Sequence, residues 1–166
     1  FENVKNKASA ITPVPGGVGL MTRAMLITVL YRLEAPDTLN EDITFNDIKG
    51  DEWYADAVKW AYENKLISGT GDGKFNPNSY ITREQLTLIM YNYAMLKGKD
   101  MSVSTDISGF EDKNEISEWA NNAFIWAKGS GLISGVSETT LSPKGTATRA
   151  QVATILMRYI ENNKEK

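Results

Sequence analysis

Ile81-Thr82-Arg83-Glu84-Gln85-Leu86 is the stretch around which this chain is organised. It occurs again as Ala147-Thr148-Arg149-Ala150-Gln151-Val152, and earlier as Met21-Thr22-Arg23-Ala24-Met25-Leu26. Each copy opens an apolar run with helical spacing, so the Thr lies where a helix N-cap belongs. The second and third copies carry Gln three residues after the Thr, which predicts a capping box, whereas Met25 leaves the first copy with the Thr cap alone. Three copies indicate an internal repeat.

An arginine follows the capping Thr in every copy, at Arg23, Arg83 and Arg149. This is the first helical position, where the helix dipole disfavours a cation by roughly 0.3–1 kcal/mol. Two explanations remain open at this point. The guanidinium can bind a neighbouring carboxylate within the protein while its stem packs on an aromatic ring. Alternatively, it can hold an anionic ligand together with free amides at the helix N-terminus.

An aromatic helix and a turn-rich loop precede the second and third copies. We expect one helix at about residues 52–65 and another that begins after Ser117. Their apolar faces share one spacing and are Trp53, Ala57, Trp60 and Ala61 in the first, and Trp119, Ala123, Trp126 and Ala127 in the second. Leu66-Ile67-Ser68-Gly69 and Leu132-Ile133-Ser134-Gly135 follow these helices. The offset is constant, since 119 − 53 and 148 − 82 both equal 66.

The composition excludes several classes of function. The 166 residues are 42% apolar and carry a formal net charge of −3, so nothing predicts nucleic acid as a partner. Cysteine and histidine are absent, which excludes disulfides, zinc sites with nitrogen or sulfur ligands, and thiol or Ser-His catalysis. No apolar run is long enough for membrane insertion, and the sequence at Phe1 does not read as a signal peptide. We expect no cofactor and no metal, because the loop that holds Asp72, Asn76 and Asn78 has Lys74 where a calcium ligand belongs.

The spacing also divides the chain. From Phe45 to Thr82 is 37 residues and from Phe110 to Thr148 is 38, but from Phe1 to Thr22 is only 21. The sequence therefore predicts a partial first repeat (1–40), a second repeat (41–100) and a third repeat (101–166) that together form one structural unit. The expected fold class is all-α, with pseudo-three-fold helical repeats of which the first is incomplete.

Five motifs follow one another in a fixed order: Phe-x-Asp, Trp-x-x-x-Ala-x-x-Trp, Leu-Ile-Ser-Gly, Gly-Asp-Gly-x-Phe-x-Pro and Ile-Thr-Arg-Glu. The first three recur unchanged in the third repeat, where Ser137-Glu138-Thr139-Thr140-Leu141 replaces Gly-Asp-Gly-x-Phe and Ala147-Thr148-Arg149-Ala150 takes the place of the last. This ordered set resembles S-layer homology (SLH) domains over residues 43–162. The resemblance implies three repeats folded as a three-pronged spindle. It also implies an extracellular module at the bacterial cell surface, fused to or associated with a surface protein or enzyme. Such modules attach without covalent bonds to anionic secondary cell-wall polysaccharides that commonly bear a pyruvate ketal.

The resemblance further implies which residues line the grooves between repeats. They are the arginines Arg23, Arg83 and Arg149, with Asp47, Asp112, Trp53, Trp119, Gly69 and Gly135. The chemistry agrees, because an arginine suits a ketal carboxylate, an aromatic face suits a pyranose and a carboxylate accepts sugar hydroxyls. Structural roles remain open for the same residues. The two tryptophans can be core, the aspartates can pair with an Arg or cap a turn, and the glycines can serve backbone shape alone.

Two other functions compete with wall binding. A glycosidase needs one asymmetric pair of carboxylates in a cleft, and Glu52/Asp56 and Glu111/Asp112 are acidic pairs. A repeat distributes similar residues over equivalent sites instead, so we expect no enzyme. A helical protein-protein scaffold is the alternative function. On the wall-binding hypothesis, Arg83→Ala and Arg149→Ala are expected to leave folding nearly intact and to weaken sedimentation with cell walls.

Overall fold

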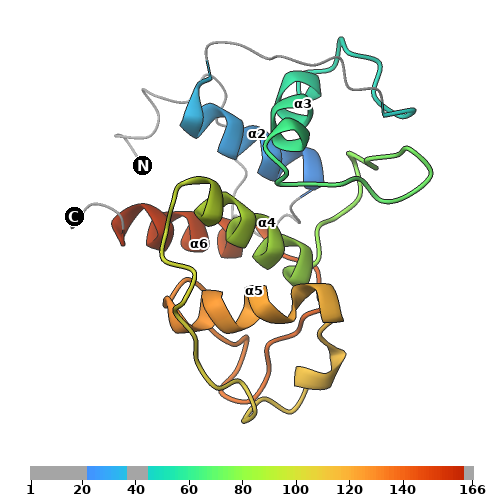
Figure 1. The fold of residues 1–166 in the computed structure, drawn as a ribbon. Coiled ribbons are helices and arrows are strands. Elements are labelled where there is room, and N and C mark those ends of the chain that lie inside the picture. Colours follow the sequence, from blue (N-terminus) through green and yellow to red (C-terminus); the bar gives the residue numbers. More distant parts are fainter. Residues whose placement is uncertain (1–21, 37–44, 163–166) are drawn as a thin grey trace.

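The fold is all-α, as predicted, in the computed structural model, which describes residues 22–36 and 45–162 (Figure 1). These residues form five α-helices: α2 (Arg23–Glu34), α3 (Ala55–Glu63), α4 (Arg83–Leu96), α5 (Glu118–Gly129) and α6 (Arg149–Glu161). A short 3-10 helix, η1 (Lys113–Glu115), precedes α5. The described residues contain no sheet, and two isolated bridges, Thr22 with Tyr80 and Thr82 with Thr146, join the chain between repeats. Within the same residues, no helix combines the length and apolarity needed to cross a bilayer.

The three Thr-Arg helices begin where the sequence predicts. Thr82 and Thr148 form complete capping boxes with Gln85 and Gln151, and Thr22 caps α2 by accepting a hydrogen bond from the Met25 amide. Gly98, just beyond α4, has a φ of 66°, a left-handed conformation that favours glycine after a helix. Local sequence therefore determines the bounds of these helices.

The aromatic helices follow the prediction less closely. Ser117 is the N-cap residue of α5, as expected, but its side chain does not cap the helix. Helix α3 begins at Ala55, not near Glu52. The Glu52 carboxylate instead accepts hydrogen bonds from the amides of Lys49 and Gly50, at 2.9 and 3.0 Å, so these residues form a turn before the helix.

Helix packing crosses the boundaries of the sequence repeats. Helix α3 packs on α2, and α5 packs on α4, which places α4 between the α2–α3 pair and α5 (Figure 1). Equivalent aromatic pairs mark both contacts: Tyr31 meets Trp60 edge-on at 5.9 Å, and Tyr91 meets Trp126 edge-on at 5.6 Å. Each aromatic helix is thus buried by the Thr-Arg helix of the preceding repeat.

Four tryptophans were expected on the apolar faces, and only two of them are buried. Trp60 and Trp126 lie in the core, as predicted. Trp53 and Trp119 are 63% and 51% exposed, so their assignment to the apolar faces is wrong. Trp119 lies in the first turn of α5, and Trp53 lies two residues before the start of α3. These two exposed indole rings are available to a ligand.

Candidate functional site

The N-termini of α2 and α4 are joined to the loop of the next repeat. The amides of Arg23 and Ala24 donate to the carbonyls of Ser79 and Pro77, both at 3.1 Å. In the same way, the amides of Arg83 and Glu84 donate to Gly145 and Pro143, at 2.8 and 2.9 Å. The hypothesis that free amides at these two helix ends hold an anion is therefore wrong. Buried backbone donors need acceptors, and the neighbouring loop supplies them.

The guanidinium of Arg83 is also engaged within the protein. Its Nε donates to the Leu141 carbonyl at 2.7 Å and its Nη2 donates to the Ser134 carbonyl at 3.0 Å. The side chain is 6% exposed, and burial lowers the pKa of Arg83 while the charge of Asp112 opposes that shift. The expectation that Arg83→Ala leaves folding nearly intact does not fit these contacts, because its removal leaves two carbonyls without their donor.

Arg23 has a freer guanidinium than its equivalent in the second repeat. It is half-buried, and its Nη1 donates to the Phe75 carbonyl at 3.2 Å. Burial lowers the pKa of Arg23, but the group stays protonated because an arginine starts far above neutral pH. The position of Phe75 matches that of Leu141, so both arginines hold the same loop of the following repeat. Arg23 does so with one nitrogen and retains donors for a ligand.

Asp47 and Asp112 each bind the loop of their own repeat that an arginine also contacts. The two oxygens of Asp47 accept hydrogen bonds from the amides of Phe75 and Asn76, at 2.9 and 2.6 Å. Asp112 accepts from Leu141 and Ser142 at the same two distances. Each loop is thus fixed by an aspartate of its own repeat and an arginine of the preceding one. This geometry supports the structural role that the sequence left open, and sugar contact by either aspartate stays a prediction.

Two equivalent grooves lie at these joints. The first groove is a pocket of 340 Å³ lined by Arg23, residues 66–70 of the second repeat, and Gln85, Leu88 and Ile89 of α4. The second groove is a pocket of 330 Å³ lined by Arg83, residues 133–136 of the third repeat, and Gln151, Thr154 and Ile155 of α6. Each groove therefore combines the arginine of one repeat with the Leu-Ile-Ser-Gly loop and Thr-Arg helix of the next.

An exposed tryptophan distinguishes the two grooves. Trp119, from α5, lines the first groove, which thereby combines side chains of α2, α4 and α5 with the loop at residues 66–70. The described lining of the second groove contains no aromatic residue. Trp53 and Arg149 are absent from the lining of both grooves. The structure thus brings Arg23, Gly69 and Trp119 together, and the roles predicted for Trp53 and Arg149 stay predictions.

Gly69 and Gly135 line their grooves and are also required by backbone shape. Gly69 has a φ of 83°, and a Cβ on it would lie 2.9 Å from both the Lys74 carbonyl oxygen and the Phe45 ring. A Cβ on Gly135 would lie 2.1 Å from the Ser137 carbonyl oxygen. Any side chain would therefore distort the loop. At both positions, therefore, the glycine lines a groove and is also required by the shape of the backbone.

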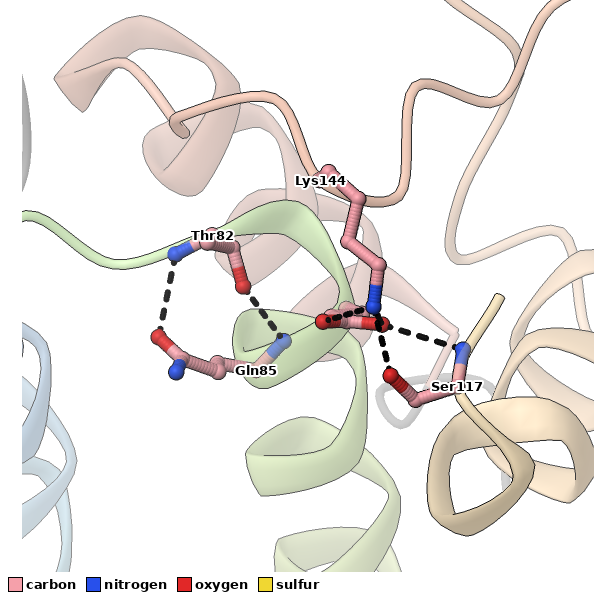
Figure 2. A network of polar contacts seen from close by, with 5 residues as sticks. Thr82, Gln85, Ser117 and Lys144 are labelled. Atoms are coloured by element: carbon pink, nitrogen blue, oxygen red, sulfur yellow. Dashed lines mark hydrogen bonds and ion pairs between the residues drawn. The ribbon is translucent and has the colours of Figure 1, made fainter. Parts of the chain in front are cut away.

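A polar network that the motifs do not predict fixes the start of α5 (Figure 2). Glu84 is 5% exposed, and its carboxylate accepts hydrogen bonds from the Lys144 ammonium at 2.8 and 2.9 Å and from the Ser117 amide at 3.2 Å. Lys144 also donates to the Ser117 hydroxyl. Because Trp119 lies two residues beyond Ser117, this network positions it at the first groove. The only signal in the sequence is that Glu84 has alanine at the equivalent position in the other two copies.

Comparisons with known proteins agree with these repeats. The sequence profile of the S-layer homology domain matches residues 44–87 and 109–153. Amylopullulanase of Thermoanaerobacterium thermosulfurigenes is 35% identical over 147 residues, which cover 86% of this chain and 8% of that enzyme. The Surface-layer 125 kDa protein of Lysinibacillus sphaericus is 32% identical over 84% of this chain and 11% of its own length. The Cellulosome-anchoring protein of Acetivibrio thermocellus is 29% identical over 89% of this chain and 34% of its own length.

The beginning of the chain is similar to a different family. The profile of the tetrahydrofolate dehydrogenase/cyclohydrolase NAD(P)-binding domain matches residues 1–36, and Bifunctional protein FolD of Bartonella tribocorum is 82% identical over 27 residues, 9% of its length. Of this segment the structure describes residues 22–36. There, α2 makes the same backbone contacts to the following loop that α4 makes. Helix α2 thus occupies the place of the Thr-Arg helix of a first repeat.

Proposed function

The chain belongs to the S-layer homology domain family, and from this premise we propose that it is a non-catalytic module that anchors a surface protein to the bacterial cell wall. Its ligand in this proposal is an anionic, commonly pyruvylated, secondary wall polysaccharide. Surface-layer proteins carry similar repeats, and the chain spans only 8% to 34% of the three relatives described above, two of which are named for surface or anchoring roles. The cargo of the module would lie in the rest of such a protein. The three-pronged spindle is part of the same proposal, with α2, α4 and α6 at its centre and α3 and α5 on two prongs.

The composition of the first groove is the observation that carries this proposal. It combines a half-buried guanidinium, the half-exposed indole of Trp119 and the amide side chain of Gln85 around one pocket. A carboxylate on a sugar pairs with the guanidinium, and the apolar face of a pyranose stacks on the indole. Partial burial of Arg23 strengthens the charged contact, because nearby apolar surface excludes water. We infer that the first groove binds the terminal acidic sugar more tightly than the second.

Sedimentation with purified cell walls tests the proposed function. Wild-type protein is expected to pellet with intact walls, and to stay in solution with walls from which the acid-labile polysaccharide has been removed. Added salt should weaken the binding, because part of it is an attraction between opposite charges in a groove open to solvent. Equal pelleting with both wall preparations would contradict the proposal.

The alternative function, a helical protein-protein scaffold, makes a different prediction in the same assay. A scaffold has no requirement for the polysaccharide, so its retention on walls would depend on wall proteins. Protease treatment of the walls separates the two functions. Binding that survives protease and is lost with the polysaccharide supports anchoring, whereas the opposite pattern supports the scaffold.

A further inference from the structure

The first groove does not end at its arginine and tryptophan. A second pocket, of 490 Å³, adjoins it and shares Leu66, Ile67, Ser68 and Leu88 as lining. Tyr62, Glu63, Lys65 and Asn92 complete this adjoining pocket. The two pockets therefore lie next to each other along the Leu-Ile-Ser-Gly loop and α4.

A longer side chain lies at the equivalent position in the third repeat. The residue that corresponds to Asn92 is Arg158, since 158 − 92 equals 66. Arg158 donates to the Leu132 carbonyl at 3.4 Å and to the Ser134 hydroxyl at 3.5 Å, and it lines the second groove itself. Asn92 makes the corresponding bond, from Nδ2 to the Leu66 carbonyl at 3.3 Å, with a much shorter side chain. The long Arg158 side chain lines the second groove itself, whereas the short Asn92 side chain lines the adjoining pocket.

The lining of the adjoining pocket suits a sugar. Tyr62 is 40% exposed, and its ring is held edge-on against Phe45 at 5.4 Å, so it offers a fixed aromatic face. Lys65 is exposed and brings a cation, and the Asn92 amide has hydrogen-bonding capacity beyond its one bond to Leu66. An aromatic face next to polar groups is the combination that holds a pyranose.

We propose that the adjoining pocket is a second subsite of the first groove and takes the next sugar residue of the wall polysaccharide. The proposal rests on the function proposed above and adds the length of ligand that each groove accepts. The first groove binds a terminal acidic sugar together with its neighbour along the polymer. The second groove, where the longer Arg158 takes the place of Asn92, binds the terminal sugar alone.

Asn92→Arg tests this subsite because it copies into the second repeat a residue that the third repeat already accommodates. Two probes are compared by titration calorimetry. One is the methyl glycoside of an N-acetylhexosamine bearing a pyruvate ketal, and the other is a short oligosaccharide fraction of purified wall polysaccharide with the same terminal unit. We expect the variant to lose about 5- to 10-fold in affinity for the oligosaccharide and to bind the monosaccharide as wild type does. The added positive charge alone would strengthen binding of an acidic polymer. A loss of affinity would therefore show that the arginine side chain fills the pocket.

Arg158→Asn is the matched control, since it leaves the first groove and its adjoining pocket untouched. It should not weaken binding of the oligosaccharide. Tyr62→Ala, which removes an exposed ring, should reproduce the selective loss, and thermal unfolding confirms that each variant is folded. Equal affinity of Asn92→Arg and wild type for the oligosaccharide would overturn the subsite and leave the proposed function intact, as would an equal loss for both probes. Failure of wild type to bind either probe would instead overturn the proposed function.

Discussion

Three arginines occupy the same position in three helices, yet their surroundings give them different roles. Arg83 is buried and donates to two carbonyls of the following repeat. Arg23 donates to one carbonyl and lines a groove with Trp119. Arg149 begins α6 and is absent from the lining of both grooves. A motif shared by all three copies therefore does not define one shared function.

Alanine substitutions should separate these roles. Arg83→Ala is expected to lower the free energy of unfolding by about 2–4 kcal/mol, because two buried carbonyls lose a charged donor. Arg23→Ala should change it by less than about 1 kcal/mol and weaken polysaccharide binding about 10-fold. Urea unfolding and wall sedimentation measure the two effects. A stable Arg83→Ala protein with normal binding would contradict the assignment of Arg83 to the joint.

The exposed tryptophans provide a second matched pair. Trp119 lines the first groove, and Trp53 lines neither groove, although both rings are more than half exposed. Trp119→Ala should therefore weaken binding about 10-fold, since a stacking surface in the site is lost, while Trp53→Ala should have little effect. Neither change should lower the unfolding temperature appreciably. Equal losses of affinity in the two variants would show that Trp53 also contacts the polymer.

At the scale of the elements, a polar clamp ties the C-terminal end of α2 to that of α4. Glu34 accepts hydrogen bonds from the Tyr93 hydroxyl at 2.5 Å and from the Lys97 ammonium at 2.9 Å. Burial acts to raise the pKa of Glu34, but the bonds from Tyr93 and Lys97 outweigh it and hold the pKa below its ordinary value. Burial, reinforced by Glu34, also raises the pKa of Tyr93 strongly. The contacts of the clamp are therefore most favourable when Glu34 is ionised and Tyr93 is neutral.

The clamp makes stability depend on pH with a defined sign. Because the folded-state pKa of Glu34 lies below its unfolded value of about 4.3, its contribution is complete above that pH and disappears as the pH falls through the folded value. Wild type should be more stable than Glu34→Gln at pH 7, and the difference should shrink in acid below about pH 4. Urea unfolding of both proteins at neutral and acidic pH measures this difference in stability. A difference that stays constant in acid would exclude Glu34 as the titrating group.

At the scale of the whole molecule, the packing unit is not the sequence repeat. Helix α5 of the third repeat packs on α4 of the second, and α3 of the second packs on α2 of the first. Buried side chains of α5, including Phe124 and Trp126, therefore need a helix from the preceding repeat. The repeats depend on one another for their cores, as in other repeat proteins.

Fragments of the chain test this dependence. A fragment of residues 101–166 contains α5 and α6 without α4, so we expect weak helicity and no cooperative thermal transition by circular dichroism. A fragment of residues 79–166 restores α4 and serves as the control, with more helix and a cooperative transition. Cooperative unfolding of the shorter fragment would show that the third repeat folds by itself.

The sequence by itself determined the helices that depend on local chemistry. Thr82 and Gln85 set the start of α4 through a capping box between neighbours in the chain, and the helical spacing of apolar residues identified Trp60 and Trp126 as core. The repeat offset of 66 residues predicted that equivalent grooves exist. The helix features were predictable because each depends on residues a few positions apart, and the equivalence of the grooves because the same motifs recur along the chain.

Only the tertiary structure decided which arginine keeps donors for a ligand, which tryptophan reaches a groove and which side chain lies beside each groove. Arg83 and Ser134 are 51 positions apart, and Glu84 and Lys144 are 60 apart, so neither contact leaves a periodic signal in the sequence. Asn92 and Arg158 differ in the sequence, but their effect on a groove appears only when α4 and α6 are each placed against a Leu-Ile-Ser-Gly loop. Local spacing specifies helices, whereas the character of a site between repeats depends on which side chains the packing of those helices brings together.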